Sequence, residues 1–528
     1  MSESKKLDLL LIHSPKFNNF YNPFGYFVMN NVIAWGMFSI ADWASQNGYG
    51  TEILHLGAET LVSRRFSLGD YIEKRRPRLI GMSCHWHYQL YDVCELARKI
   101  KLRFPDISIV VGGYTATYFS DDILASQTGI DFIVRGEAEE PVLKLLEAVE
   151  GRSDIGEVPN LSYRQGEVVR HNAITFSADK RFLEGLTFCR LDLLKNYKIY
   201  QRYLSYPVWL RSYPRFLNYS ILTSGRMEGY MVPVGRGCPV NCVYCGGGRE
   251  WAASHFGRTK TVLRSPERVM SDILRARSFG AESLYFPFDP YPRSDYYPRL
   301  FQRIRKAGLR FYATFESFGL PNSAFVSEFA MTFGRDRRNQ ILLSPETGSE
   351  ALRSSHKGYS YSNRDLFDTL DRIEREGVGF QICYSLGLPG ESEDTLRETL
   401  NLWNTIAGRY RNCVIQTATL IDFDPGSPAE QSKEVPRYTF DSLYRMHRDS
   451  HKRSYTGWTY LPQRHVCREM IGARDPGSGY RSLRRTKCRH FCTYMDRFHI
   501  RYPFNRILCV ALGVLFRIVR RPVKELPF

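Results

Sequence analysis

Three cysteines, Cys238, Cys242 and Cys245, lie in the short stretch GRGCPVNCVYCGGG and could bind metal through their thiolates. Structural zinc takes four closed ligands, usually as two pairs, and no fourth cysteine lies nearby. Iron–sulfur clusters are normally held by four thiolates, so three would leave one iron open to chemistry. The spacing predicts a 4Fe-4S cluster with an open iron. His255, ten residues beyond Cys245, leaves zinc as the alternative.

The first 150 residues alternate apolar runs with amphipathic stretches, which predicts strands and helices in turn. The predicted helices include 91–104 and 140–151. The runs lie at 8–14, 51–57, 78–85, 107–114 and 130–137. This alternation predicts a doubly wound, Rossmann-like α/β domain over 1–150 with a parallel sheet. Its ligands would bind at the carboxyl ends of the strands.

A second alternation begins at residue 226 and continues to 430. Its predicted strands lie at 229–237, 283–290, 310–317, 340–347, 380–390 and 413–426. Six such units predict a partial (β/α)6 barrel of the TIM type, with its chemistry at strand carboxyl ends. The cysteines follow the first of these strands. Residues 151–225 are expected to form a linker with a small hairpin, and 431–528 a basic, mostly helical C-terminal domain.

The cysteine spacing, C-x3-C-x2-C, resembles the signature of the radical SAM superfamily, and Tyr244 fits the aromatic position before the last cysteine. The stretches LLSPETGSEALRSSHKGYS, YSLGLPGESEDTL and DFDPGSPAEQ resemble its fourth, fifth and sixth strand regions, in order, over 226–430. The resemblance implies that Cys238, Cys242 and Cys245 hold the cluster, and that S-adenosylmethionine (SAM) chelates its open iron. The implied SAM-binding residues are Tyr244, Glu346, Ser385 and Asp289. Glu316 would touch SAM or substrate, and an ordinary surface role is the alternative for each carboxylate.

Residues 1–150 resemble the cobalamin-binding domain that precedes the radical SAM domain in one large subclass. The resemblance rests on VVGGYTAT and DFIVRGEAEEPVLKLLE, which follow GMSCHWH. The implied cobalamin-binding residues are Ser83, His85, Trp86, Gly112, Gly113, Thr115, Gly136 and Glu137, with Thr117 as an alternative to Thr115.

The loop after the first strand, HSPKFNNFYNPFG, lacks the Asp-x-His-x-x-Gly pattern that ligates cobalt from below in many such domains. We therefore expect cobalamin with its tail base displaced and no histidine supplied by that motif. The loop SCHWHYQ should meet the lower face, with Trp86 as a cover and His85 as a weak ligand. The alternative is that Trp86 is a core aromatic residue beside the sheet.

Together these resemblances imply a cobalamin-dependent radical SAM enzyme, most directly a C-methyltransferase. A 5′-deoxyadenosyl radical would abstract hydrogen, and methylcobalamin would give a methyl group to a poorly activated carbon. One alternative is a related cyclase or oxidoreductase without methyl transfer. Another is a cobalamin-binding sensor or scaffold with a structural cluster. No catalytic residue is assigned.

The net charge is +18, with much of the excess in the last hundred residues. Such charge suits an acidic, phosphorylated or carrier-bound substrate, a nucleic acid or an anionic membrane. No nucleic-acid motif is present, so nucleic acid is not expected as a partner. The expected partners are a small-molecule, peptide or carrier-bound substrate and an external electron donor of the flavodoxin or ferredoxin type.

The 12 cysteines are mostly scattered and no signal peptide precedes them, which favours a reducing cytoplasm. The apolar segment 507–516, flanked by arginines, is too short to span a bilayer. It is expected to be a core helix, with a membrane-peripheral helix as the alternative. Cys467, Cys488 and Cys492, with His490, are expected to be ordinary thiols rather than a second cluster site. Four further residues of this region could cap the barrel: Trp458, Tyr460, His465 and Tyr480.

Overall fold

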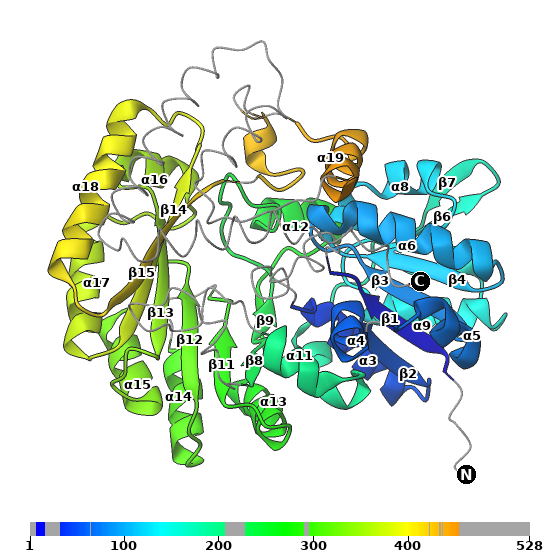
Figure 1. Ribbon diagram of the computed structural model, residues 1–528, viewed down its shortest axis with the longest axis horizontal. Coiled ribbons are helices and arrows are strands. Elements are labelled where there is room, and N and C mark those ends of the chain that lie inside the picture. The colour runs from blue at the N-terminus through cyan, green and yellow to red at the C-terminus, as the bar shows by residue number, and fades with distance from the viewer. Residues whose placement is uncertain are drawn as a thin grey trace.

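The computed structural model describes residues 7–15, 32–63, 65–205, 228–289, 295–421, 423–431, 435, 437–452 and 528. Two α/β units lie side by side, the first formed by the N-terminal part of the chain and the second by the middle part (Figure 1). The fold class is the one that the sequence predicts: a Rossmann-like unit followed by an open, barrel-like unit.

The first unit is built on a seven-stranded sheet in the order β2-β1-β3-β4-β5-β6-β7. Its five predicted strands are present and parallel. The strands are β1 (Leu9–His13), β2 (Thr51–His55), β3 (Leu79–Ser83), β4 (Ser108–Gly112), β5 (Phe132–Val134), β6 (Leu161–Gln165) and β7 (Val168–His171). The strand order reverses between β1 and β3, so a ligand crevice is expected at their carboxyl ends.

Helices cover both faces of this sheet because its central strands are apolar on both sides. In α6 the apolar residues recur every three or four positions, at Leu90, Val93, Leu96, Ala97 and Ile100, and all are buried. Burying each leucine or isoleucine stabilises the fold by roughly 1.5–3 kcal/mol. The helices are α3 (Trp35–Gln46), α4 (Leu56–Val62), α5 (Leu68–Arg75), α6 (Leu90–Arg103), α7 (Tyr114–Tyr118), α8 (Ser120–Ser126) and α9 (Glu139–Val149).

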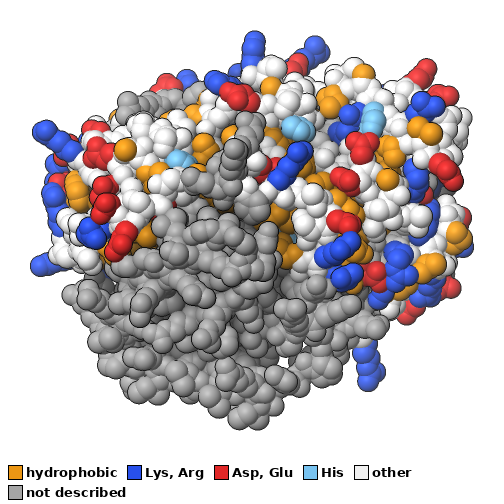
Figure 2. Space-filling model, turned by 90° about the horizontal axis from the view of Figure 1, so that it is seen from above, with side chains coloured by type: hydrophobic (Ala, Val, Ile, Leu, Met, Phe, Trp, Pro, Cys, Tyr) orange, Lys and Arg blue, Asp and Glu red, His pale blue; other side chains and the backbone are white. Residues whose placement is uncertain are grey.

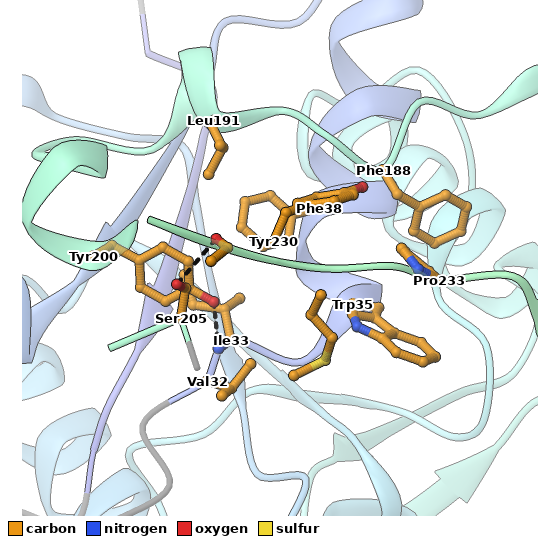
Figure 3. A pocket seen from close by; sticks show the side chains of 12 residues that line it. Val32, Ile33, Trp35, Phe38, Phe188, Leu191, Tyr200, Ser205, Tyr230 and Pro233 are labelled. Carbon is orange, nitrogen blue, oxygen red and sulfur yellow. Dashed lines mark hydrogen bonds between the residues drawn. The ribbon is translucent and has the colours of Figure 1, made fainter. Parts of the chain in front are cut away.

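The hairpin expected in the linker is β6–β7, and it turns at Gly166 with a φ of +63°. It pairs antiparallel with β5, so it extends the first sheet. The next segment carries α10 (Lys180–Gly185) and α11 (Tyr197–Tyr203). It packs between the units beside a narrow apolar cavity with room for about one water molecule (Figure 3). There Ser205 Oγ donates to the Gly229 carbonyl at 3.1 Å, and the Ile33 amide donates to the Tyr200 hydroxyl at 3.1 Å.

The second unit is an open barrel of six parallel strands in the order β15-β14-β13-β12-β11-β8. The strands are β8 (Gly229–Met231), β11 (Ser283–Phe286), β12 (Tyr312–Ser317), β13 (Gln340–Glu346), β14 (Gly379–Leu386) and β15 (Cys413–Leu420). The helices on its outer face are α13 (Pro266–Ser278), α14 (Tyr296–Lys306), α15 (Ser323–Phe333), α16 (Glu350–His356), α17 (Asn363–Arg375) and α18 (Glu393–Arg409) (Figure 1). Ser265 caps α13, with Pro266 in its first turn.

The strand predicted at 229–237 is divided in the structure. After β8 the chain reaches Pro233, which has no amide hydrogen to continue the ladder. It then forms β9 (Gly235–Arg236), which pairs antiparallel with β10 (Val262–Leu263) in a separate sheet. The cysteines therefore follow β9 rather than the first barrel strand directly, and α12 (Arg249–Phe256) follows them.

The predicted C-terminal domain is described only at its start. Helix α19 (Phe440–Lys452) packs on α6, and His447 Nε2 lies 3.1 Å from His87 Nδ1. The segment 507–516, the possible capping residues and the cysteines at 467, 488 and 492 lie outside the described residues. No helix in the described part of the chain is long and apolar enough to cross a membrane. On the face shown in Figure 2, basic and acidic side chains are interspersed.

Candidate functional site

The cysteine loop, residues 238–245, lies between β9 and α12 with its three thiols half-buried. The Gly247 amide donates to Cys245 Sγ at 3.2 Å, and the Gly358 amide donates to Cys242 Sγ at 3.2 Å. Amide donors of this kind stabilise sulfurs that carry charge in an iron–sulfur cluster. Burial raises the pKa of the Cys245 thiol to about 12, so a bound metal must displace its proton.

Loops from the barrel press closely on the cysteine loop. A Cβ added at Gly358 would lie 2.3 Å from Val240 Cβ, and one added at Gly246 would lie 2.8 Å from Asp424 Cβ. The Gly246 amide also donates to Asp424 Oδ2 at 2.9 Å. These approaches require glycine at 246 and 358. They fix the loop against the segments that follow α16 and β15.

Glu346, at the end of β13, brings together three of the predicted SAM-binding residues. Its carboxylate accepts hydrogen bonds from the Tyr244 hydroxyl at 3.1 Å and from Ser385 Oγ at 2.5 Å. Its φ is +65°, and the β13–β14 register shifts between Leu343 and Glu346. Backbone strain and bulges of this kind cluster at functional sites. The local distortion therefore places the carboxylate between β14 and the cysteine loop.

The sequence interpretation missed Lys357, whose ammonium donates to Glu346 Oε1 at 3.2 Å. Lys357 is only 8% exposed. Burial lowers its pKa, but the Glu346 carboxylate, Tyr361 and Cys242 together outweigh that effect and the pKa is raised. The ammonium also acts electrostatically on Cys238 and Cys242. A buried positive charge thus lies beside the thiols, where an anionic cluster or a ligand carboxylate would be bound.

Two further predicted carboxylates lie on neighbouring strands. Glu316, on β12, accepts a hydrogen bond from the Tyr285 hydroxyl, and burial raises its pKa. Glu316 is electrostatically coupled to Lys357 and Glu346, so it belongs to the same site. Asp289 is fully buried and accepts from Ser317 Oγ at 3.3 Å. Asp289 thus contacts the end of β12.

In the first unit, the predicted cobalamin-binding glycines lie where β3 and β4 end. Gly113 has a φ of +111°, and an added Cβ would lie 2.8 Å from the Cys84 carbonyl and from the His85 backbone. Thr115 Oγ1 donates to the His85 carbonyl at 3.2 Å. Glycine at 113 is therefore required for the two loops to meet. Ser83, Gly112, Gly113, Thr115 and His85 are brought together at this carboxyl edge.

The loop after β3 presents a cluster of rings at this edge. The His85 ring packs edge-on against Trp86 and against Tyr114, both at 4.7 Å between centroids. Trp86 stacks on Tyr88 at 5.8 Å. His85 and Trp86 are half-buried, and burial lowers the pKa of His85 to about 4. The His85 ring is therefore neutral near pH 7, the form that could ligate a metal.

Tyr114, which the sequence interpretation also missed, connects this loop to the cysteine loop. Its ring packs on Trp251 at 5.3 Å and on Phe256 at 4.7 Å, both on α12. A Cβ added at Gly247 would lie 3.6 Å from the Tyr114 hydroxyl oxygen and 3.6 Å from Cys245 Sγ. The loop predicted to bind cobalamin and the loop predicted to bind the cluster therefore adjoin.

Glu137, which the sequence predicts to bind cobalamin, is bound by protein groups in the structure. Its carboxylate forms ion pairs with Arg236 at 2.8 Å and with Arg258, and it accepts from the Ala178 amide at 2.8 Å. Gly136 donates to Thr117 Oγ1 at 3.0 Å, so Thr117 supports this turn. Glu137 thus joins the two units, and its oxygens are already engaged by protein donors.

His255, the fourth ligand that the zinc alternative would use, has contacts with its own helix. The His255 ring stacks on Trp251 at 4.3 Å, and its Nδ1 lies 3.0 Å from the Trp251 carbonyl. Within the described ranges no three His, Cys, Asp or Glu side chains are gathered closely enough to hold a metal ion, and this is true of the three loop cysteines as well. The hydrogen bonds to the sulfurs and the nearby Lys357 charge are features that suit a cluster.

Two family models match the chain, the B12 binding domain over residues 28–146 and the Radical SAM superfamily over residues 232–402. A curated relative, the anaerobic magnesium-protoporphyrin IX monomethyl ester cyclase of Synechocystis, is 31% identical over 30% of this chain and 27% of its own length. The hopanoid C-3 methylase of Methylococcus capsulatus is 26% identical over 46% of this chain and 40% of its own length. The chain thus spans well under two thirds of either relative.

Two solved structures share the fold. The radical SAM methyltransferase TsrM from Kitasatospora setae superposes with a TM-score of 0.59 at 14% identity, over 80% of this chain and 76% of that one. The cobalamin-dependent SAM radical enzyme OxsB superposes with a TM-score of 0.58 at 11% identity, over 94% of this chain and 72% of that one. The chain thus carries a B12-binding domain followed by a radical SAM domain, and the three-cysteine loop lies in the second.

Proposed function

We propose that this protein is a cobalamin-dependent radical SAM C-methyltransferase that acts on a poorly activated carbon. The observation that carries the proposal is the meeting of the two candidate cofactor loops, where Tyr114 reaches the loop of Cys245. The bound cofactors would supply a 5′-deoxyadenosyl radical and a transferable methyl group. Hydrogen abstraction and methyl transfer at one carbon require both cofactors to face the same substrate position. Two adjoining loops would hold the cofactors in that arrangement.

Different residues of the chain would bind the cluster, SAM and cobalamin. Cys238, Cys242 and Cys245 would hold a 4Fe-4S cluster, and SAM would chelate its fourth iron. Tyr244, Glu346 and Ser385 would bind the rest of SAM, with Lys357 as the counter-charge for a carboxylate. Ser83, Gly112, Gly113 and Thr115 would hold cobalamin. Asp289 is proposed to bind SAM and Glu137 to bind cobalamin, and each would exchange a protein contact for the ligand.

Trp86 and His85 are proposed to lie on the lower face of cobalamin. The ring cluster at the end of β3 supports this, because it stands at the carboxyl edge where the ligand crevice is expected. The neutral His85 ring could ligate cobalt weakly, and the Trp86 indole would keep water away. Replacing Trp86 or His85 by alanine should change the axial signature of the cobalt(II) EPR spectrum. Unchanged spectra from both variants would contradict this assignment.

The test of the main proposal is anaerobic reconstitution with iron, sulfide, cobalamin and SAM. We expect one four-iron cluster, which Cys242→Ala abolishes, and 5′-deoxyadenosine on addition of a strong reductant. Stoichiometric zinc without iron, or no 5′-deoxyadenosine, would contradict the proposal. The second outcome would favour the sensor or scaffold alternative.

A cyclase or oxidoreductase without methyl transfer is the second candidate, because one matched relative is a cyclase. Deuterated methyl-SAM separates the two, since only a methyltransferase places deuterium in its product.

The proposed partners are a small-molecule, peptide or carrier-bound substrate and a flavodoxin- or ferredoxin-type donor, in a reducing cytoplasm that suits an oxygen-sensitive cluster. Contact with a membrane surface through 507–516 is a further proposal.

A further inference from the structure

The junction between the two units contains a buried network of two arginines and two glutamates. Arg236, on β9, and Arg258, just after α12, belong to the second unit, whereas Glu137 and Glu139 belong to the first. We propose that this network sets the spacing and angle between the cobalamin loops and the cysteine loop, with Arg236 as its central positioning residue. This inference rests on the proposed function, because it assigns the network a task in that same site.

Arg236 is fixed through both of its terminal nitrogens. Its Nη1 lies 2.8 Å from Glu137 Oε2 and 3.1 Å from Glu139 Oε2. Its Nη2 donates to Glu139 Oε1 and, at 3.1 Å, to Ser39 Oγ. A guanidinium held by two carboxylates has its plane as well as its position defined. The network therefore constrains the angle between the two units more tightly than apolar packing alone would.

The network is shielded from solvent. The side chains of Arg236, Glu137 and Glu139 are 16%, 9% and 1% exposed. Arg258, which is 5% exposed, donates through Nε to Glu137 and through Nη2 to the Ala178 carbonyl at 2.7 Å. Salt screens such buried pairs little, and removing one partner leaves an uncompensated charge. The junction should therefore hold one geometry across ionic strengths.

Each end of the network is attached to a candidate cofactor loop. Arg236 stands two residues before Cys238 in the chain. Glu137 directly follows Gly136, where an added Cβ would lie 3.2 Å from Phe256 Cα on α12. Displacement of either end would move both loops relative to each other. Cofactor and substrate groups must be held within about 0.5 Å of their productive geometry, so a small displacement matters.

The chain offers a matched control in the ion pair between Arg190 and Asp42. It has a similar burial, with 14% and 3% exposure, and its nitrogen–oxygen distance is 2.7 Å. It joins the segment before α11 to α3 and touches none of the candidate cofactor residues. Arg190→Met therefore reports the general cost of breaking a buried arginine–carboxylate pair.

The test compares wild type, Arg236→Met and Arg190→Met, each loaded with the iron–sulfur cluster and cob(II)alamin and reduced with dithionite. The readout is the enhancement of cob(II)alamin electron-spin relaxation by the reduced cluster, which falls steeply with the distance between them. We expect both variants to bind iron and cobalamin at wild-type stoichiometry. In Arg236→Met the enhancement should change by at least about twofold, and in Arg190→Met it should stay at the wild-type value.

An unchanged enhancement in Arg236→Met, or an equal change in Arg190→Met, overturns the positioning role. If Arg236→Met does not fold, Glu139→Gln keeps the side-chain shape, removes one charge and should shift the enhancement in a smaller step. An unshifted Glu139→Gln then overturns the inference. Failure of wild type to hold both cofactors, or to show any interaction between them, is the failure of the proposed function instead.

Discussion

At the scale of single residues, Lys357 is the side chain on which SAM binding should depend most. It balances the buried Glu346 carboxylate beside the cysteine loop. In Lys357→Met, we expect the cluster to remain and SAM affinity to fall about tenfold or more, because a charged hydrogen bond is lost from a buried site. Equilibrium dialysis of reconstituted protein with labelled SAM measures this.

The control is Lys195→Met, which removes a more exposed lysine that is also paired with a buried carboxylate, that of Glu59 in the first unit. It should bind SAM as wild type does. Equal affinities in wild type and Lys357→Met would show that Lys357 serves only the fold.

His85 gives a prediction for acid stability. Its pKa is about 4 in the folded protein because of burial, against about 6.5 when unfolded, so the unfolded state takes up a proton first as pH falls. As far as His85 is concerned, the folded state keeps its full stability above pH 6.5 and loses stability as the pH falls towards 4. Between pH 7 and 5, His85 should account for about 1–2 kcal/mol of the loss. The free energy of unfolding of the cobalamin-free protein, measured at pH 7 and at pH 5, should fall less in His85→Gln than in wild type.

An identical loss in wild type and His85→Gln would contradict this assignment of the acid sensitivity.

At the scale of elements, the meeting of the β3 and β4 loops depends on Gly113. An alanine there has an unfavourable φ and a Cβ 2.8 Å from the backbone of the facing loop. Gly113→Ala should destabilise the protein by about 2–4 kcal/mol and weaken cobalamin retention. Gly151→Ala is the control, because its φ is +75° but nothing lies within 4 Å, so it should cost only about 1 kcal/mol. The denaturant midpoints of the two variants compare these losses of stability. Similar losses at both positions would contradict the prediction, because the positive φ alone, and not the close contact, would then set the cost.

The strands of both sheets could be predicted because their apolar runs are long and are separated by clear helical patterns. The division of the run at 229–237 depends on the missing amide of Pro233, which a hydrophobic pattern does not register. Lys357 was missed because a lone lysine in a loop resembles any surface charge. The ion pairs of Glu137 could not be predicted, because its arginine partners are 99 and 121 residues away in the sequence.

At the scale of the whole molecule, the charge of +18 predicts how an electron donor will approach. Flavodoxin-type donors that are acidic should be attracted, and salt should screen that attraction. Raising the ionic strength from about 0.05 to about 0.5 M should slow cluster reduction by such a donor about tenfold or more. Stopped-flow absorbance follows the reduction. Dithionite is the comparison, because this small anion carries far less charge than an acidic protein and its rate should change far less with salt. A salt-independent rate with the protein donor would contradict it.

The open barrel has a consequence for recombination between related enzymes. Its edges, β8 and β15, do not pair with each other, and the neighbouring unit supplies Tyr114 and Glu137 at the junction. A chimera that exchanges only the N-terminal half would bring a new surface against Arg236 and Arg258. Functional chimeras should therefore arise chiefly when both halves of the junction are inherited from one parent, which makes the pair of domains the natural unit of exchange.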